Sequence, residues 1–207
     1  MSFRERWIDS IHRAATSSKK YRNLLTPVGI LIFLGFLTLV IVLSLLTDRL
    51  FHFPKLLPVP WNGAIYLPII IIGAFFMLWS VFHFLKLKGT PVPFNPPPKL
   101  VSTGPYAYVR NPMLTGVFIL LFGLGFAIDS LSLAFIFTPV LIILNYFELK
   151  KIEEPELERR LGQEYIEYKN RVPMFFPSFK GRAVNKQSMT PLTETHLPRF
   201  ILPGYLI

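Results

Sequence analysis

Residues 90–116 read TPVPFNPPPKLVSTGPYAYVRNPMLTG, a polar and proline-rich stretch between two strongly apolar parts of the chain. Backbone without regular structure is tolerated in a membrane protein only where protein or water covers it. The chain has 207 residues, of which 52% are hydrophobic and only 16% are charged. This composition is too apolar for a soluble domain of the same length. The sequence therefore predicts a membrane protein in which residues 90–116 form a ligand site beside the bilayer.

Four long apolar runs predict the transmembrane helices. Residues 23–47 and 61–85 each exceed the ~20 residues needed to cross about 30 Å of hydrocarbon. Residues 111–128 and 130–147 are shorter runs of eighteen residues separated by Asp129, which predicts a tight hairpin of short spans. The first run follows a basic stretch and lacks a small-residue cleavage pattern. It is therefore expected to be a permanent span and not a removable signal peptide.

Small residues and prolines within the last two runs predict how these helices pack. Gly116, Gly123 and Gly125 are expected to let neighbouring helices approach closely. Pro139 is expected to bend the fourth span. Such positions more often serve packing than chemistry.

Amphipathic segments are predicted at both sides of the spans. Residues 2–15 carry Phe3, Trp7 and Ile11 four positions apart on one helical face, which predicts an interfacial helix. A frayed terminus is the alternative interpretation of this segment.

Residues 153–171 predict a second amphipathic helix that lies on the membrane or closes over the site. Pro155 suits its first turn, and Glu156 with Arg160 forms an i,i+4 ion pair. Residues 178–207 show no clear periodicity, and no function is assigned to this tail.

The charge distribution indicates which surface the protein contacts. The net charge is +10, and the basic residues gather beside the apolar runs, which favours anionic lipid headgroups as partners over nucleic acid. The heaviest basic clusters precede the first span, follow the second and follow the last, so both termini and residues 90–116 are expected to be cytoplasmic. The chain has no cysteine, which excludes disulfides, a thiol nucleophile and a thiolate metal site.

Polar groups in residues 90–116 are candidates for binding a ligand. Gly104 permits a sharp turn, and Pro112 suits the first turn of the third span. The free N–H groups of that helix, with Arg110, offer a site for a carboxylate or phosphate. Tyr106 and Tyr108 offer ring faces and hydroxyls. The alternative is an ordinary interfacial loop with tyrosines in the membrane belt and an arginine that snorkels to headgroups.

Glu153 and Glu154 form an acidic pair near the end of the fourth span. Adjacent carboxylates there could hold an ammonium group and ribose hydroxyls, or could favour the start of the next helix through its dipole. The four histidines lack the spacing of metal ligands, so no metal site is predicted. Neither a glycine-rich phosphate loop nor a G-x-S-x-G motif is present.

Several separated elements share the spacing of a known family. They are Gly104-Pro-Tyr-Ala-Tyr-Val-Arg110-Asn-Pro112-Met-Leu-Thr-Gly116, Glu153-Glu154-Pro-Glu-Leu157, Gly162-x-x-Tyr165-x-x-Tyr168 and Val172-Pro173. Together they resemble the isoprenylcysteine carboxyl methyltransferase family and its phospholipid methyltransferase relatives over residues 86–177. The resemblance implies an integral membrane methyltransferase that uses S-adenosylmethionine, with the cofactor pocket on the cytoplasmic side beneath the C-terminal helix.

The resemblance also implies cofactor contacts at named positions. The family's contacts carry over to Gly104, Arg110, Asn111, Pro112, Met113, Leu114 and Glu153, and more loosely to Glu154. Tyr106 and Tyr108 are added as groups that stack on adenine or contact the sulfonium. No catalytic base is named.

Two positions depart from the family pattern. The family motif usually has histidine where this chain has Asn111, which can still hydrogen-bond the cofactor. In the prenylcysteine enzymes an arginine about one turn before the acidic pair binds the substrate carboxylate, and this chain has Leu149 there, beside Lys150 and Lys151. These departures weaken the prenylcysteine assignment more than the methyltransferase assignment.

The predicted fold is all-α and membrane-integral, with about four transmembrane helices, an N-terminal interfacial helix and a C-terminal amphipathic helix. One membrane domain is expected, with an interfacial segment (1–22), two first spans (23–85), a cofactor-binding core (86–177) and a tail (178–207).

The predicted function is methyl transfer from S-adenosylmethionine to a lipophilic acceptor, such as a prenylcysteine-type carboxylate or a lipid amine. One alternative is an NADPH-dependent reductase of the sterol or steroid kind, whose motif is a related Arg-His-Pro. The other alternative is a structural membrane protein without enzymatic activity.

Overall fold

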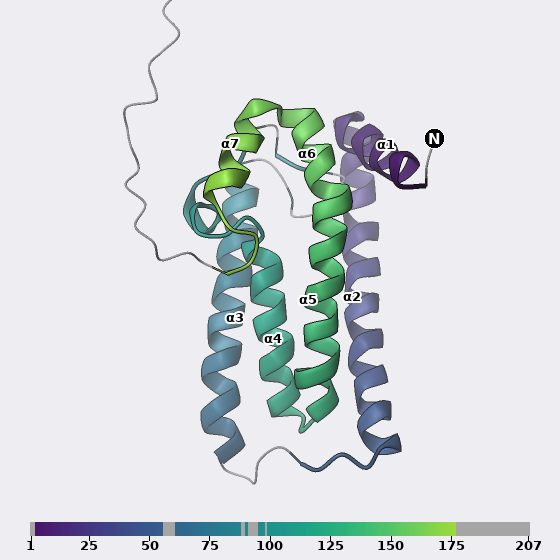
Figure 1. Cartoon of the computed structure of the whole chain (residues 1–207), viewed down its shortest axis with the longest axis vertical. Coiled ribbons are helices and arrows are strands. Elements are labelled where there is room, and N and C mark those ends of the chain that lie inside the picture. Colours follow the sequence, from purple (N-terminus) through teal and green to yellow (C-terminus); the bar gives the residue numbers. More distant parts are fainter. Residues whose placement is uncertain (1–2, 56–60, 88–89, 91–94, 98, 177–207) are drawn as a thin grey trace, which may run out of the picture.

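The structure is a computed structural model that describes residues 3–55, 61–87, 90, 95–97 and 99–176. Helices make up the bundle, and no strand occurs among the described residues (Figure 1). The predicted tail, and five residues of the proline-rich stretch at 91–94 and 98, lie outside the described part of the chain. The all-α prediction is confirmed.

Three helical segments are long and apolar enough to cross a membrane. They are α2 (Lys19–Leu50), α3 (Trp61–Lys86, counted from Gly63) and the continuous helix Leu133–Leu161. The third predicted span is α4 (Pro112–Ala127), an apolar helix of 16 residues, which is about 24 Å long at ~1.5 Å per residue. The protein is therefore an integral membrane protein, and α4 is shorter than the other three segments.

The helices run alternately up and down, so that distant parts of the sequence meet at one end (Figure 1). This end, which is uppermost in Figure 1, is called the site end here. It holds α1 (Phe3–Thr16), the start of α2, the connection between α3 and α4, and the helices that follow α5 (Thr138–Glu148). At the opposite end, Asp129 adopts a φ of 54° in the short turn after α4. The tight hairpin predicted at Asp129 is confirmed.

The helix Leu133–Leu161 contains two π turns, each followed by a proline. The turn η2 (Leu133–Phe137) precedes Pro139 in α5, and the turn η3 (Leu149–Glu153) precedes Pro155 in α6 (Glu154–Leu161). A proline has no N–H and cannot continue the regular hydrogen-bond ladder of an α-helix. The wider π turns are therefore found where the ladder has to adjust, which refines the bend predicted at Pro139.

The prediction of one continuous amphipathic helix over residues 153–171 is wrong. The structure has two helices there, α6 and α7 (Gln163–Arg171), separated by Gly162. Gly162 has a φ of 62° and a ψ of −140°, a conformation that is open almost only to glycine. The break lets α7 turn back across the site end instead of continuing away from α5 (Figure 1).

Close backbone contact joins α3 to α4. A Cβ atom on Gly116 would lie 2.5 Å from the backbone nitrogen of Met77, and one on Gly73 would lie 2.8 Å from the backbone nitrogen of Leu120. Similar contacts surround Gly123, beside Ile69 and Ile70 of α3, and Gly125, beside Ala134. The close approach predicted for Gly116, Gly123 and Gly125 is confirmed, and it is of the kind that brings membrane helices together.

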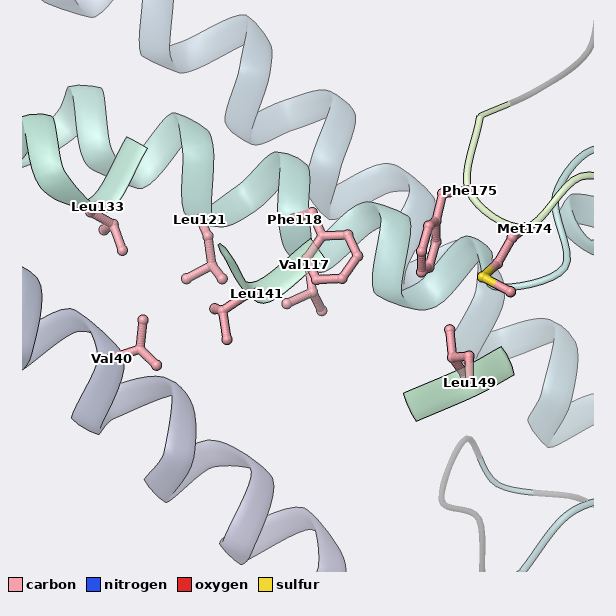
Figure 2. Packing of buried hydrophobic residues seen from close by; sticks show 9 residues of the cluster. All are labelled: Val40, Val117, Phe118, Leu121, Leu133, Leu141, Leu149, Met174 and Phe175. Carbon is pink, nitrogen blue, oxygen red and sulfur yellow. The ribbon is translucent and has the colours of Figure 1, made fainter. Parts of the chain in front are cut away.

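The buried core lies between α2, α4 and the helix Leu133–Leu161 (Figure 2). At the site end this core is closed by Met174 and Phe175, which follow α7. The rings of Phe118 and Phe175 meet edge to face with centroids 5.5 Å apart. The segment after α7 is thereby anchored in the bundle, and this anchoring positions the site described next.

Candidate functional site

Hydrogen bonds attach the start of α4 to the segment after α7. The N–H of Arg110 donates to the carbonyl of Pro173 over 2.8 Å, and the N–H of Asn111 donates to the carbonyl of Met174 over 3.1 Å. These bonds hold residues 110–111 and 173–174 side by side. The Gly104–Gly116 element and the Val172-Pro173 element of the sequence pattern are therefore in direct contact.

Gly104 begins the short helix η1 (Gly104–Ala107) and lies against a histidine of α3. Its φ is 60°, and a Cβ atom there would lie 2.7 Å from the ring of His83. The ring nitrogen Nε2 of His83 lies 2.9 Å from Oγ1 of Thr103. Gly104 is thus required both by its backbone conformation and by the space that His83 occupies.

His83 was not among the residues predicted for the site, because a histidine near a helix end is commonly interfacial. The available signal was that residues 61–85 contain no Asp, Glu, Lys or Arg, and that His83 is their one histidine and precedes the polar stretch by a few residues. Its ring is also stacked on Tyr106, with centroids 6.1 Å apart. The structure therefore adds His83 to the site.

The two predicted tyrosines lie in different environments. Tyr106 is buried, its ring contacts Phe84 with centroids 4.7 Å apart, and its carbonyl accepts a hydrogen bond of 2.7 Å from the hydroxyl of Tyr168. Burial, together with the nearby Tyr168 and the charge of Glu153, raises the pKa of Tyr106 above its ordinary value, so this hydroxyl stays protonated. Tyr108 is 56% exposed.

Arg110 and Glu154 form the central ion pair of the site. Nη2 of Arg110 lies 2.8 Å from Oε1 of Glu154, and both side chains are about nine-tenths buried or more. Nη1 of Arg110 donates to the carbonyl of Lys169 over 3.2 Å, and Nζ of Lys169 lies 3.2 Å from Oε2 of Glu154. Lys169 also pairs with Glu158 at 2.7 Å. The polar loop, α6 and α7 are thus joined by one charged network.

Glu153 occupies the last position of η3, immediately before the paired Glu154. In its ionised form the carboxylate of Glu153 raises the pKa of two buried tyrosines of the site end, Tyr106 and Tyr165. For Tyr165 the larger causes are burial and the charge of Glu154, while Arg110 acts in the opposite direction. Glu154 therefore contacts the polar loop through Arg110 and α7 through Lys169, and Glu153 lies near enough to Tyr106 and Tyr165 to influence their pKa.

The first turn of α4 offers backbone donors beside this network. Pro112 is buried at the first helical position, where its missing N–H costs nothing. The N–H groups of Met113 and Leu114 have no partner within an α-helix that starts there. The side chain of Asn111 does not cap this helix, so it leaves these two groups accessible to another acceptor.

An apolar cavity of about 190 Å³ extends from the site into the bundle. Leu114 belongs both to the predicted cofactor motif and to the cavity wall, and Asn145 of α5 is the polar side chain that reaches the cavity. The other lining residues come from α2, α4 and α5 and are Phe33, Phe36, Leu37, Val117, Phe118, Leu121 and Leu141. The site therefore has a polar side at the bundle end and an apolar side between helices.

The donor set of the site suits a ligand that carries a carboxylate, an ammonium group and hydroxyls. Nε of Arg110 is buried and has no hydrogen-bond partner, although its two terminal nitrogens are engaged. A buried donor of this kind is costly to leave unpaired. Together with the N–H groups of Met113 and Leu114 and the two carboxylates, it fits a zwitterionic amino-acid group.

A helical bundle with spanning helices defines a polytopic membrane protein, and this one carries a charged network at one end of the bundle. Residues 63–164 match the phospholipid methyltransferase family, which is consistent with a membrane methyltransferase. The resemblance predicted from residues 104–116 and 153–157 is confirmed, whereas Tyr165, Tyr168 and Val172-Pro173 lie beyond the matched region.

The chain is also similar to the nickel-cobalt-cadmium resistance protein NccN of Alcaligenes xylosoxydans xylosoxydans. The two are 32% identical over 100 residues, which are 48% of this chain and 42% of that protein. The chain thus matches less than half the length of this relative. No solved structure matches the chain.

Proposed function

We propose that the protein transfers the methyl group of S-adenosylmethionine to a lipophilic acceptor at the membrane. The observation that carries this proposal is the buried pair of Arg110 and Glu154, which joins the two separated halves of the methyltransferase motif. The pair leaves Nε of Arg110 without a partner and lies beside the first turn of α4. This is the donor arrangement that the carboxylate of the cofactor's methionyl part needs.

Different residues of the site would bind different parts of the cofactor. Arg110 and the N–H groups of Met113 and Leu114 would bind the carboxylate, and the carboxylates of Glu153 and Glu154 would bind the ammonium group or the ribose hydroxyls. The buried ring of Tyr106 and the exposed ring of Tyr108 would border the adenine or the sulfonium. Gly104 would let the backbone approach the ligand.

Methyl transfer from S-adenosylmethionine mainly requires that the protein align the acceptor with the methyl group and exclude water from the site. When bound, S-adenosylmethionine supplies a methyl group that its sulfonium already activates. The protein has to hold the acceptor in line with it, and such alignment can lower a barrier by about 7 to 11 kcal/mol in favourable cases. A carboxylate acceptor is ionised at neutral pH and needs no base, whereas an amine has to lose a proton first.

The cavity between α2, α4 and α5 supports a lipophilic acceptor. Its wall is apolar except for Asn145, and Leu114 places it next to the cofactor motif. An acceptor delivered by the membrane would enter sideways between helices, with its reactive group toward the site end. The basic residues that flank the helices support a cytoplasmic site end and contact with anionic lipids.

Calorimetry with S-adenosylmethionine on protein in detergent tests this proposal. Arg110→Ala and Glu153→Gln are each expected to weaken binding by about 1 to 3 kcal/mol, the usual loss for a charge-assisted contact. Arg49→Ala and Glu164→Gln are matched controls, because both side chains are exposed, Arg49 at the end of α2 that is opposite the site end. Labelled S-adenosylmethionine incubated with a total lipid and prenylthiol extract would then identify the acceptor.

The same measurements separate the alternatives. Tight binding of NADPH without binding of S-adenosylmethionine would overturn the proposal in favour of a reductase. If neither ligand binds the unaltered protein, Arg110→Ala and Glu153→Gln have no binding to weaken. That result would instead indicate a structural membrane protein.

A further inference from the structure

Helix α1 lies outside the family-matched residues 63–164, yet it packs against the helix that carries the acidic pair. Figure 1 shows α1 beside α6 at the site end of the bundle, and the contacts below confirm that the two helices touch. Ile11 and Ala15 are buried on α1, at 8% and 4% exposure. The helix predicted to be interfacial therefore uses one of its faces to contact the protein itself.

The first polar contact reaches the π turn η3, next to which Pro155 removes one backbone donor from the helix. Nε of Arg4 donates to the carbonyl of Lys151 over 2.9 Å. Arg4 of α1 thus satisfies a backbone acceptor in η3, within the five residues that end at Glu153.

Two further contacts hold α6 itself. Nδ1 of His12 lies 3.1 Å from Oε1 of Glu156, which also accepts a bond of 3.0 Å from Nε of Arg160. Glu156 is only 3% exposed, so its carboxylate depends on these partners. Asp9 pairs with Arg159 at 2.5 Å, at a more exposed position where a pair alone is worth little.

The two sides of α6 are thereby held by different parts of the chain. On one side Glu156 and Arg159 meet α1, and on the other side Glu154 meets Arg110 and Lys169. Because α6 is a short helix of 8 residues, a shift at Glu156 moves Glu154 as well. The position of the acidic pair is therefore set jointly by α1 and by the polar loop.

We propose that α1 is a positioning element of the cofactor site, with Arg4, Asp9 and His12 as positioning residues that act through α6. Undocking of α1 lets α6 shift and separates the acidic pair from Arg110, which weakens cofactor binding. The inference rests on the proposed function for the identity of the ligand. The docking of α1 on α6 does not depend on that function.

The natural absence of cysteine gives a direct test of docking. In membranes, the pair Asp9→Cys and Arg159→Cys is expected to be joined by a short bifunctional thiol crosslinker, detected by mass spectrometry. A crosslinker is used because the ion pair is made by the tip of a long arginine side chain, whereas a direct disulfide needs closer backbones. The pair Asp9→Cys and His52→Cys is the control, because His52 lies at the opposite end of α2. Failure of the first pair to crosslink would overturn the inference.

Charge exchange tests positioning. Asp9→Arg and Arg159→Asp are each expected to weaken binding of S-adenosylmethionine about fivefold or more, the lower end of usual coupling between sites. Each reversal places like charges together, and the double variant restores the pair, so its affinity is expected to return to within about twofold of the unaltered protein. His12→Asn keeps a donor near the position of Nδ1 and is expected to bind S-adenosylmethionine as tightly as the unaltered protein does. His12→Ala removes this donor and is expected to bind S-adenosylmethionine more weakly.

The outcomes are distinguishable. If the cysteine pair crosslinks but the single charge reversals leave the affinity for S-adenosylmethionine unchanged, α1 docks without positioning the site. An equal loss of affinity in the single and double charge variants would also overturn the positioning role. If the unaltered protein does not bind S-adenosylmethionine, the proposed function fails and cofactor positioning fails with it, while the crosslink still reports whether α1 docks.

Discussion

Gly104 and Gly162 both hold a positive φ, but only Gly104 has a neighbour where a side chain would project. Gly104→Ala and Gly162→Ala are each expected to destabilise the protein by about 1 to 3 kcal/mol, because alanine is strained in such conformations. His83→Ala should recover part of the loss at Gly104 and none at Gly162. Thermal unfolding of the single and double variants in detergent measures this coupling, and equal behaviour of the two glycines would contradict the contact with His83.

The residues of the site could be predicted from sequence better than their partners. Gly104, Arg110 and the acidic pair follow from motif spacing, and the structure brings them together. That Arg110 pairs with Glu154 itself could not be predicted, because the pairing depends on the direction of α6 and on the break at Gly162. His83 was missed for a similar reason, since its neighbours come from a different segment of the chain.

At the scale of helices, the contact between α3 and α4 is made by backbone atoms. Gly116→Ala is expected to cost about 1 to 3 kcal/mol, because its Cβ meets the backbone nitrogen of Met77 and no rotamer change can remove that overlap. Gly35→Ala in α2 is the matched control, since nothing lies within 4 Å of its Cβ position. That control is expected to be neutral or to gain about 0.5–1 kcal/mol.

Thermal unfolding of both variants in detergent gives the comparison. A Gly116→Ala protein as stable as the Gly35→Ala protein would show that α3 and α4 do not pack as closely as described.

The helices themselves follow from the lengths of the apolar runs, but their interruptions do not. The apolar periodicity near Glu154 is compatible with one helix over residues 153–171, because hydrophobic spacing does not report whether a turn has α or π geometry. The break at Gly162 had a sequence signal, the glycine itself, but glycine inside a helical pattern is tolerated often enough that it does not decide the matter.

At the scale of the whole molecule, the alternating direction of the helices predicts which connections lie on the same side of the membrane. Single cysteines at Lys20 and Ser102, both exposed, are expected to react with an impermeant thiol reagent only from the cytoplasmic side, because basic residues flank this end. A cysteine at His52, at the other end of α2, is expected to react only from outside. Labelling of intact cells and of inverted membrane vesicles distinguishes the two faces, and labelling of all three from one face would contradict the up-and-down arrangement.

The π turn before the acidic pair sets the orientation of the helix that follows it. A π turn accommodates one residue more than an α turn, so residues 149–153 behave as an α-helix with an insertion. Deleting one residue there would restore α geometry and leave the helix downstream in its present orientation. If the same residues adopted α geometry without a deletion, everything downstream would rotate by about 100°, which would carry the acidic pair away from Arg110. A protein that shares the motif residues and has one residue fewer in this turn is therefore expected to keep the same site with an α turn in place of the π turn.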